Sequence, residues 1–102
     1  MITAIVTFAI PHDMTAEQWF AIIDSVAPRF RKVPGLVRKH FLFQPGIGGG
    51  AYLWQDRAAA DAFYNDVWRA SLRRIAIGAP QIVYYETQIV VDNAADEISI
   101  AA

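Results

Sequence analysis

The stretch LVRKHFLFQPGIGGGAYLWQ, residues 36–55, decides the fold. Leu36 to Gln44 predicts one strand and Ala51 to Gln55 predicts another, with the glycine-rich segment PGIGGG from Pro45 to Gly50 between them. A turn that needs positive φ explains the glycines, so this stretch is expected to form a β-hairpin. A phosphate-binding loop is excluded, because such loops open a helix and this one leads into a strand.

On the N-terminal side of this hairpin, a strand and then a helix are expected. Ile2 to Ile10 is rich in β-branched and aromatic residues, which favour a strand. Thr15 and Gln18 have the spacing of a capping box, which satisfies free amides at a helix start. Apolar residues then recur at three- and four-residue steps. Pro28 lies inside this helical pattern, so we expect a kink or break near Ala27.

A second helix and a last strand are expected on the C-terminal side. Asp56 can cap a helix that runs from about Arg57 to Ile77. Gly78 and Pro80 are expected to end this helix, since glycine favours the end of a helix and proline cannot continue it. Gln81 to Val91 then predicts the fourth strand.

The resulting order, βαββαβ, is the ferredoxin-like arrangement of the α+β class. It places two helices on one face of a four-stranded antiparallel sheet. Residues 1–93 are expected to form this domain, and residues 94–102 a C-terminal tail. The apolar Ile98 and Ile100 in that tail favour docking on a neighbouring subunit.

The sheet face without helices is also expected to be apolar. Hydrophobic residues make up 55% of the 102-residue chain and charged residues 19%, which is more apolar surface than one small core can bury. Both faces of the first and last strands carry apolar side chains, whereas a one-sided sheet alternates with polar ones. We therefore expect a homodimer in which two open faces pack together.

Composition and charge exclude several classes of protein. A net charge of −1 is not that of a nucleic-acid binder, and the absence of cysteine excludes disulfides and thiolate catalysis. No apolar stretch approaches the roughly 20 residues that a membrane span needs. No signal peptide is visible at the start of the sequence, so a cytoplasmic location is expected.

Four segments of the sequence carry a resemblance to a known family. They are Pro34 to Leu42, Gly49 to Gln55, Ala58 to Tyr64 and the pair Trp68-Arg69. The chain resembles the YdhR-like group of monooxygenases in the dimeric α+β-barrel superfamily, over nearly its whole length. This resemblance implies a face-to-face dimer and a small-molecule cleft between helices and sheet in each subunit.

The resembled superfamily hosts cofactor-free oxygenases of polyketide rings, haem-degrading enzymes, isomerases and cyclases, so the fold does not settle the function. The haem-degrading enzymes use a histidine on the second helix, which this chain lacks. Our first expectation is a cofactor-independent monooxygenase that acts on a small aromatic or polyketide-type molecule, without metal or flavin. An isomerase or cyclase that needs no dioxygen is one alternative. A dimeric module that binds a small hydrophobic metabolite without catalysis is another.

Cofactor-free oxygenation requires a general base or proton shuttle, aromatic walls around a flat ring, and a dry cavity. His40 and Glu86 are the candidate catalytic groups, expected to point from strands into an enclosed space. An exposed strand histidine and a carboxylate at the dimer interface are the simpler interpretations of these two residues. The candidate substrate-binding residues are aromatic, although core packing explains them equally: Tyr52, Trp54, Tyr84, Trp19, Phe63 and Trp68.

Overall fold

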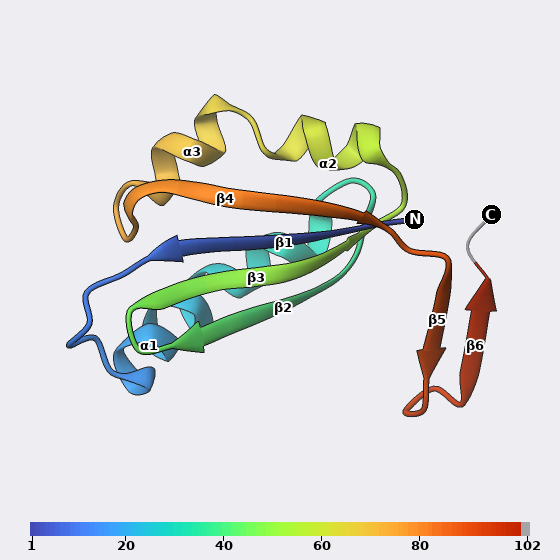
Figure 1. Ribbon diagram of the computed structural model, residues 1–102, viewed down its shortest axis with the longest axis horizontal. Coiled ribbons are helices and arrows are strands. Elements are labelled where there is room, and N and C mark those ends of the chain that lie inside the picture. Colours follow the sequence, from blue (N-terminus) through green and yellow to red (C-terminus); the bar gives the residue numbers. More distant parts are fainter. Residues whose placement is uncertain (101–102) are drawn as a thin grey trace.

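The computed structural model describes residues 1–100, and its centre is a four-stranded antiparallel sheet. The strands are β1 (Ile2–Ala9), β2 (Leu36–Gln44), β3 (Ile47–Trp54) and β4 (Ile77–Glu86), in the order β2-β3-β1-β4 (Figure 1). β1 pairs with both β3 and β4, so the two central strands are the first and third along the chain. This confirms the ferredoxin-like α+β fold.

The helices cover one face of this sheet (Figure 1). They are α1 (Ala16–Val26), the 3-10 helix η1 (Ala27–Lys32), α2 (Arg57–Phe63) and α3 (Asp66–Leu72). Alternate residues of β1 point toward them, and Ala4, Val6 and Phe8 are therefore buried.

The start and the break of the first helix were both predicted correctly. Thr15 and Gln18 form the full capping box, in which each side chain accepts a hydrogen bond from the backbone N–H of the other residue. The α-helix ends at Val26, and η1 follows with Pro28 in its first turn. Proline is tolerated there because the first turn of a helix needs no N–H donor.

The prediction of one helix from Arg57 to Ile77 is wrong. Asp56 caps α2 as expected, but the helix stops at Phe63, and the Asn65 side chain accepts a hydrogen bond from the Trp68 N–H to begin α3. Asparagine is favoured at the start of a helix because its side-chain oxygen accepts a hydrogen bond from a free backbone N–H of the first turn.

Gly78 and Pro80 do not end a helix; they lie in β4, which begins at Ile77 rather than at Gln81. β4 is an edge strand of the sheet. A proline is tolerated there because its missing N–H can lie on the free edge, where no other strand needs it as a hydrogen-bond donor. Gly78 has φ +76°, which glycine adopts without strain. The pairing of β1 with β4 is irregular at this end, between Thr7 and Ala9.

The glycine-rich segment is mostly strand rather than turn. β3 begins at Ile47, and within Pro45 to Gly50 only Gly46 has positive φ, at +83°. A Cβ at Gly46 would lie 2.5 Å from the His12 Cε1 atom, so both the backbone and the packing require glycine. Gly48, Gly49 and Gly50 are extended and buried, and they need another explanation than the turn.

The C-terminal part differs from the predicted fourth strand and tail. β4 ends at Glu86, and β5 (Ile89–Asp92) pairs instead with β6 (Glu97–Ile100) in a separate hairpin. This hairpin projects from one end of the main sheet (Figure 1). Residues 101 and 102 of the predicted tail lie outside the described residues.

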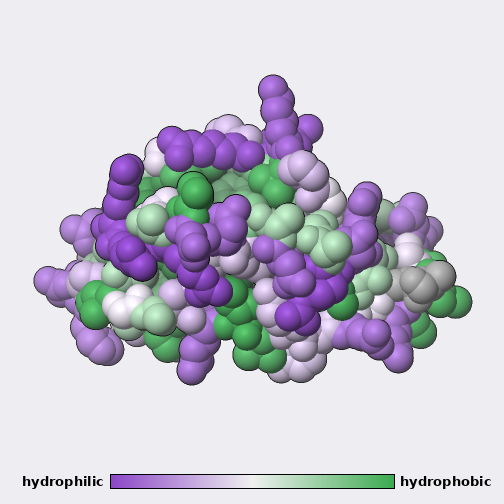
Figure 2. Space-filling model, turned by 90° about the horizontal axis from the view of Figure 1, so that it is seen from above, coloured by the Kyte–Doolittle hydropathy of each residue, from purple (hydrophilic) through white to green (hydrophobic). Residues whose placement is uncertain are grey.

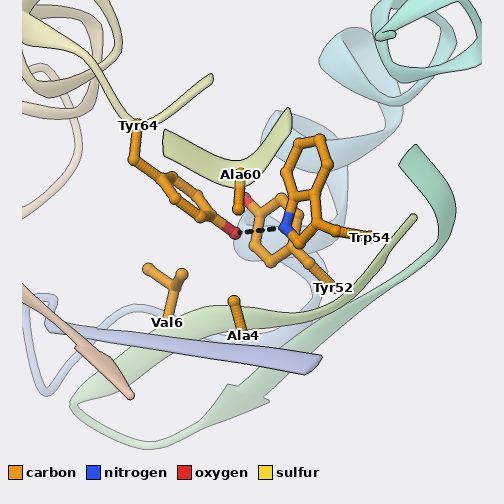
Figure 3. Packing of buried hydrophobic residues seen from close by; sticks show 6 residues of the cluster. All are labelled: Ala4, Val6, Tyr52, Trp54, Ala60 and Tyr64. Carbon is orange, nitrogen blue, oxygen red and sulfur yellow. Dashed lines mark hydrogen bonds between the residues drawn. The ribbon is translucent and has the colours of Figure 1, made fainter. Parts of the chain in front are cut away.

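Two clusters of buried residues form the core. The larger contains Ala4, Val6, Tyr52, Trp54, Ala60 and Tyr64, shown in Figure 3. In it the Trp54 indole N–H donates to the Tyr64 hydroxyl at 3.2 Å, so the buried polar atoms of both residues are satisfied. The smaller cluster contains Phe8, Ile10 and Trp19.

Outside the core, the surface is mixed. Figure 2, which views the molecule from above Figure 1, shows polar side chains over most of this face with apolar residues between them. Within residues 1–100, no helix is long and apolar enough to cross a membrane.

Candidate functional site

A cavity of about 1110 Å³ lies between the helices and the sheet. Residues of α1, η1, α2, α3 and the three strands β1 to β3 line it. Its volume is that of a site for a drug-sized or larger molecule, since such sites occupy roughly 300–1,000 Å³. We call it the aromatic cavity after the seven rings in its wall: Phe8, Trp19, Phe30, Phe41, Tyr52, Phe63 and Trp68.

The strand glycines make room for this cavity. Gly48 pairs with Phe8 and Phe43, and Gly50 pairs with Val6 and Phe41, so both glycines face the helices. A Cβ at Gly48 would lie 2.7 Å from the Trp19 ring, and one at Gly50 would lie 3.1 Å from the Lys39 Cε atom. Without side chains here, the strand leaves space for Trp19 and Lys39.

The side-chain amine of Lys39 lies against the aromatic wall of the cavity. Its Nζ lies 3.5 Å from the ring centre of Phe30, 3.9 Å from that of Phe41 and 4.5 Å from that of Tyr52. The ion pairs among residues 1–100 join Arg38 to Asp92 and Arg57 to Asp61, and neither involves Lys39. The amine therefore lies among ring faces and has no carboxylate partner in the described part of the chain.

Burial shifts the pKa of this amine and that of the neighbouring Tyr52 phenol. Desolvation lowers the pKa of Lys39 from 10.5 to about 7. The ring faces act in the opposite direction because they attract an ammonium, but they are weaker than a carboxylate partner would be. Burial also raises the pKa of Tyr52, so its phenol stays protonated near neutral pH. A neutral amine and a neutral phenol can thus coexist in the aromatic cavity.

Four of the predicted substrate-binding residues line the aromatic cavity: Tyr52, Trp19, Phe63 and Trp68. Trp19 is 3% exposed, and its indole N–H has no hydrogen-bond partner among the described residues. Its wall position therefore carries the cost of one unmade hydrogen bond.

The other two predicted aromatic residues lie outside the aromatic cavity. Trp54 is fully buried against Tyr52, with the two rings stacked 5.8 Å apart, and belongs to the core (Figure 3). Tyr84 lies under the guanidinium of Arg57, whose Cζ atom is 3.6 Å from the centre of the Tyr84 ring. The prediction that these side chains contact a ligand in the cavity is not supported by their positions.

The expected placement of both candidate catalytic residues needs correction. His40 pairs with Ala51 on the open face of the sheet and is exposed, so it points away from the aromatic cavity. Glu86 is the last residue of β4 and is also exposed. Neither residue lines the cavity, and neither lies in an enclosed space.

A β-bulge explains why Lys39 replaces His40 in the cavity. Leu36 pairs with Trp54 on the helix side, and the register then shifts, so Arg38 pairs with Leu53 on the open side. The extra residue turns the following residues to the opposite face. The sequence contained a signal for this. Phe41 and Phe43 follow Lys39 at steps of two residues, so the three share one face of the strand, and the large apolar rings indicate that this face is buried.

Metal ligands do not gather anywhere in the described chain. Within residues 1–100, no three His, Asp or Glu side chains lie close enough together to hold an ion. The buried and half-buried polar groups of the aromatic cavity are the Lys39 amine, the Tyr52 phenol and the Trp19 indole. The other polar residues that border it are exposed: Arg29, Lys32, Gln55, Asn65, Ser71 and Arg74.

Comparison with known proteins finds solved structures of the same fold. No family model and no curated protein matches the sequence. A Deinococcus radiodurans protein assigned as an antibiotic biosynthesis monooxygenase is similar in structure, with a TM-score of 0.65 and 16% identity over 90% of this chain and 97% of that one.

Two oxygenases of known name share the same fold. SnoaB from Streptomyces nogalater, a cofactor-independent oxygenase, has a TM-score of 0.60 and 16% identity, covering 85% of this chain and 92% of that chain. The ActVA-Orf6 monooxygenase of Streptomyces coelicolor, solved with nanaomycin D, has a TM-score of 0.60 and 23% identity, covering 84% and 86%. The chain thus shares its fold with these three solved structures.

Proposed function

We propose that this protein is a YdhR-like, cofactor-independent monooxygenase that oxidises a small aromatic or polyketide-type molecule in the aromatic cavity. The observation that carries the proposal is the pairing of a ring-lined cavity of about 1110 Å³ with one partly buried amine, Lys39. Flat aromatic substrates stack well against aromatic walls. The fold that the chain shares with oxygenases such as SnoaB supports the same class of reaction.

In this proposal Lys39 is the general base. Its neutral form accepts a proton from an acidic phenol or anthrone, and the pKa of about 7 suits transfer at neutral pH. The resulting anion is electron-rich and gives an electron to dioxygen. A carbon–oxygen bond then forms, one oxygen atom stays on the ring as a carbonyl, and the other leaves as water. The substrate is the reductant, so the electrons balance.

The apolar wall supports this chemistry in two ways. Ring faces of Phe30 and Phe41 exclude water from the amine, which keeps part of it neutral. They also hold a positive charge once Lys39 has accepted the proton, because a ring face attracts an ammonium. The ammonium formed then stabilises the substrate anion beside it.

Oxygen uptake with a panel of anthrones and naphthols tests the proposal. The wild type is expected to consume dioxygen with at least one of these, with a rate that rises as the pH passes about 7. Removing a general base typically costs about 10²–10⁴-fold in rate, so Lys39→Met should lose most of the activity. His40→Ala, on the opposite face of the sheet, should keep it. No uptake with any substrate, or full activity in Lys39→Met, contradicts the proposal.

An isomerase or cyclase that uses the same cavity remains the second candidate. A neutral amine can move a proton within a substrate without dioxygen, so the Lys39 environment serves this reaction equally. Turnover under nitrogen would favour this function over oxygenation. Tight binding of an anthrone with no turnover in either atmosphere would favour a binding module.

A further inference from the structure

The amine of Lys39 faces a ligand-sized cavity rather than a carboxylate, and this geometry permits more than proton transfer. We propose that Lys39 is also a carbonyl-capturing residue: flat aromatic aldehydes or ketones bind in the aromatic cavity and form an imine with its Nζ. The proposal uses the cavity described above but does not depend on oxygen chemistry.

The ring faces around Nζ define where such a ligand would lie. The amine is 3.5 Å from the centre of Phe30 and 3.9 Å from that of Phe41. A planar ligand stacked on the remaining aromatic wall, which includes Phe63 and Trp68, would bring its edge toward this amine. The carbonyl on that edge is then held beside the nucleophile, and such positioning speeds bond formation.

The lack of an ion-pair partner keeps the amine available. Among residues 1–100, the carboxylates within ion-pair distance of a basic side chain belong to Asp61 and Asp92, which pair with Arg57 and Arg38 and not with Lys39. Burial in turn lowers the pKa of Lys39 to about 7, so a large fraction is neutral near neutral pH. A lysine desolvated in a hydrophobic pocket is the usual form of an imine-forming lysine.

The reaction balances without any oxidant or reductant. The Nζ lone pair attacks the carbonyl carbon, the carbonyl π-bond electrons move to oxygen, and proton transfer gives a carbinolamine. Loss of water then breaks the carbon–oxygen bond and forms the carbon–nitrogen double bond. The dry walls of the aromatic cavity favour this imine, because its hydrolysis needs water.

Reductive trapping with 2-naphthaldehyde and cyanoborohydride tests the proposal. The chain has two lysines, so peptide mass spectrometry distinguishes the sites directly. Lys32 is the internal reference, because it also borders the cavity but is exposed. At neutral pH, the naphthylmethyl group is expected to be attached to Lys39 at least about tenfold faster than to Lys32, because a desolvated amine is more often neutral and therefore nucleophilic.

Two controls separate cavity capture from ordinary amine reactivity. Naphthalene, which has no carbonyl, should protect Lys39 and leave Lys32 labelling unchanged. Lys39→Arg, which retains a long cationic side chain, should show labelling at Lys32 but none at position 39. A circular dichroism spectrum shows whether this variant folds.

Three outcomes overturn the proposal: equal labelling of the two lysines, no labelling of Lys39, or labelling of Lys39 that naphthalene does not slow. The experiment is done under nitrogen, so a protein that lacks oxygenase activity can still pass it. Conversely, oxygen uptake without trapping would reject carbonyl capture and leave the proposed oxygenation intact.

Discussion

Lys39 lies in the aromatic cavity at a cost in stability. A lysine placed among Phe30, Phe41 and Tyr52 loses water that no carboxylate in the described chain replaces. Apolar side chains fill such positions more favourably, because burying an unpaired charge is expensive. Residues that lower stability in a cleft often serve function, and the combination of a cavity with a desolvated amine fits that pattern.

The stability of the protein should therefore rise with pH. Lys39 has a pKa of about 7 in the folded chain and 10.5 as an ordinary lysine, so between these values the unfolded state binds more protons. Stability increases with pH wherever that holds. We expect the free energy of unfolding, measured by urea denaturation, to increase from pH 7 toward pH 9.

Lys39→Met supplies the comparison, since methionine has a similar length and no charge. It should be more stable than the wild type at pH 6 and should lose the rise above pH 7. Parallel curves for the two proteins would show that another group causes the pH dependence.

Gly48 should be sensitive to the smallest added side chain. A Cβ there would lie 2.7 Å from the Trp19 Cη2 atom, and Trp19 is buried and cannot move freely. Overpacking of this kind typically costs about 1–3 kcal/mol, so Gly48→Ala should lower the free energy of unfolding by that amount. Trp19→Phe in the same chain should restore part of the loss, because the smaller ring leaves room. Additive effects in this double-mutant cycle would contradict the contact.

At the residue scale, the sequence predicts the walls of the site better than its chemistry. Tyr52 and Trp19 follow from strand alternation and helical spacing, which set the side a residue faces. The candidate base could not be assigned in the same way. A one-residue bulge between Leu36 and Arg38 exchanges the two faces of β2, and the residues at the bulge do not mark it. Only Phe41 and Phe43, further along the strand, indicate which face is buried.

At the scale of elements, some boundaries were predictable from the residues that define them, and others were not, even where a side-chain cap defines them. The capping box of Thr15 and the helix break at Pro28 both follow from the residues themselves. The division of the second helix after Phe63 depends instead on Asn65, a residue that also occurs within helices. Likewise, Pro80 is acceptable in a strand only because β4 has a free edge.

The C-terminal hairpin is held to the sheet by a pH-dependent contact. The Arg38 guanidinium donates to the Asp92 carboxylate at 2.7 Å, and this bond lowers the pKa of Asp92 below its usual 3.8. A carboxylate with a lowered pKa stabilises the folded state above the ordinary value, and this stabilisation is lost as the pH falls through the lowered one. The hairpin should therefore loosen in acid.

Hydrogen exchange of the backbone amides in β5 and β6 measures this loosening. After correction for intrinsic rates, exchange in the wild type should be faster near pH 3 than at pH 6. Asp92→Asn should exchange rapidly at both values. Asp61→Asn removes an ion pair on α2 and serves as the control, since it should leave the hairpin unaffected. Equal protection of the hairpin in the wild type at the two pH values would contradict the role of Arg38 and Asp92.

At the scale of the whole molecule, the apolar surface is concentrated away from the helices. Val83 and Tyr85, on the open face of β4, are 45% and 58% exposed. The hairpin adds Ile98 and Ile100, which are 71% and 79% exposed. Exposed apolar side chains on the open face and on the hairpin are typical of surfaces that another molecule covers.

A second copy of the chain is the partner that we expect on the open face, so the protein should sediment as a dimer at micromolar concentration. Val83→Lys places a charge on this face, and in a two-fold dimer the change occurs twice. Burying an unpaired charge costs several kcal/mol, and each ~1.4 kcal/mol is tenfold, so Kd should rise by about a hundredfold or more. Val67→Lys is the matched control, because Val67 is 77% exposed on α3, on the helix side of the sheet. A wild type that sediments as a single chain, or a dimer that only Val67→Lys disrupts, would show that the open face does not mediate self-association.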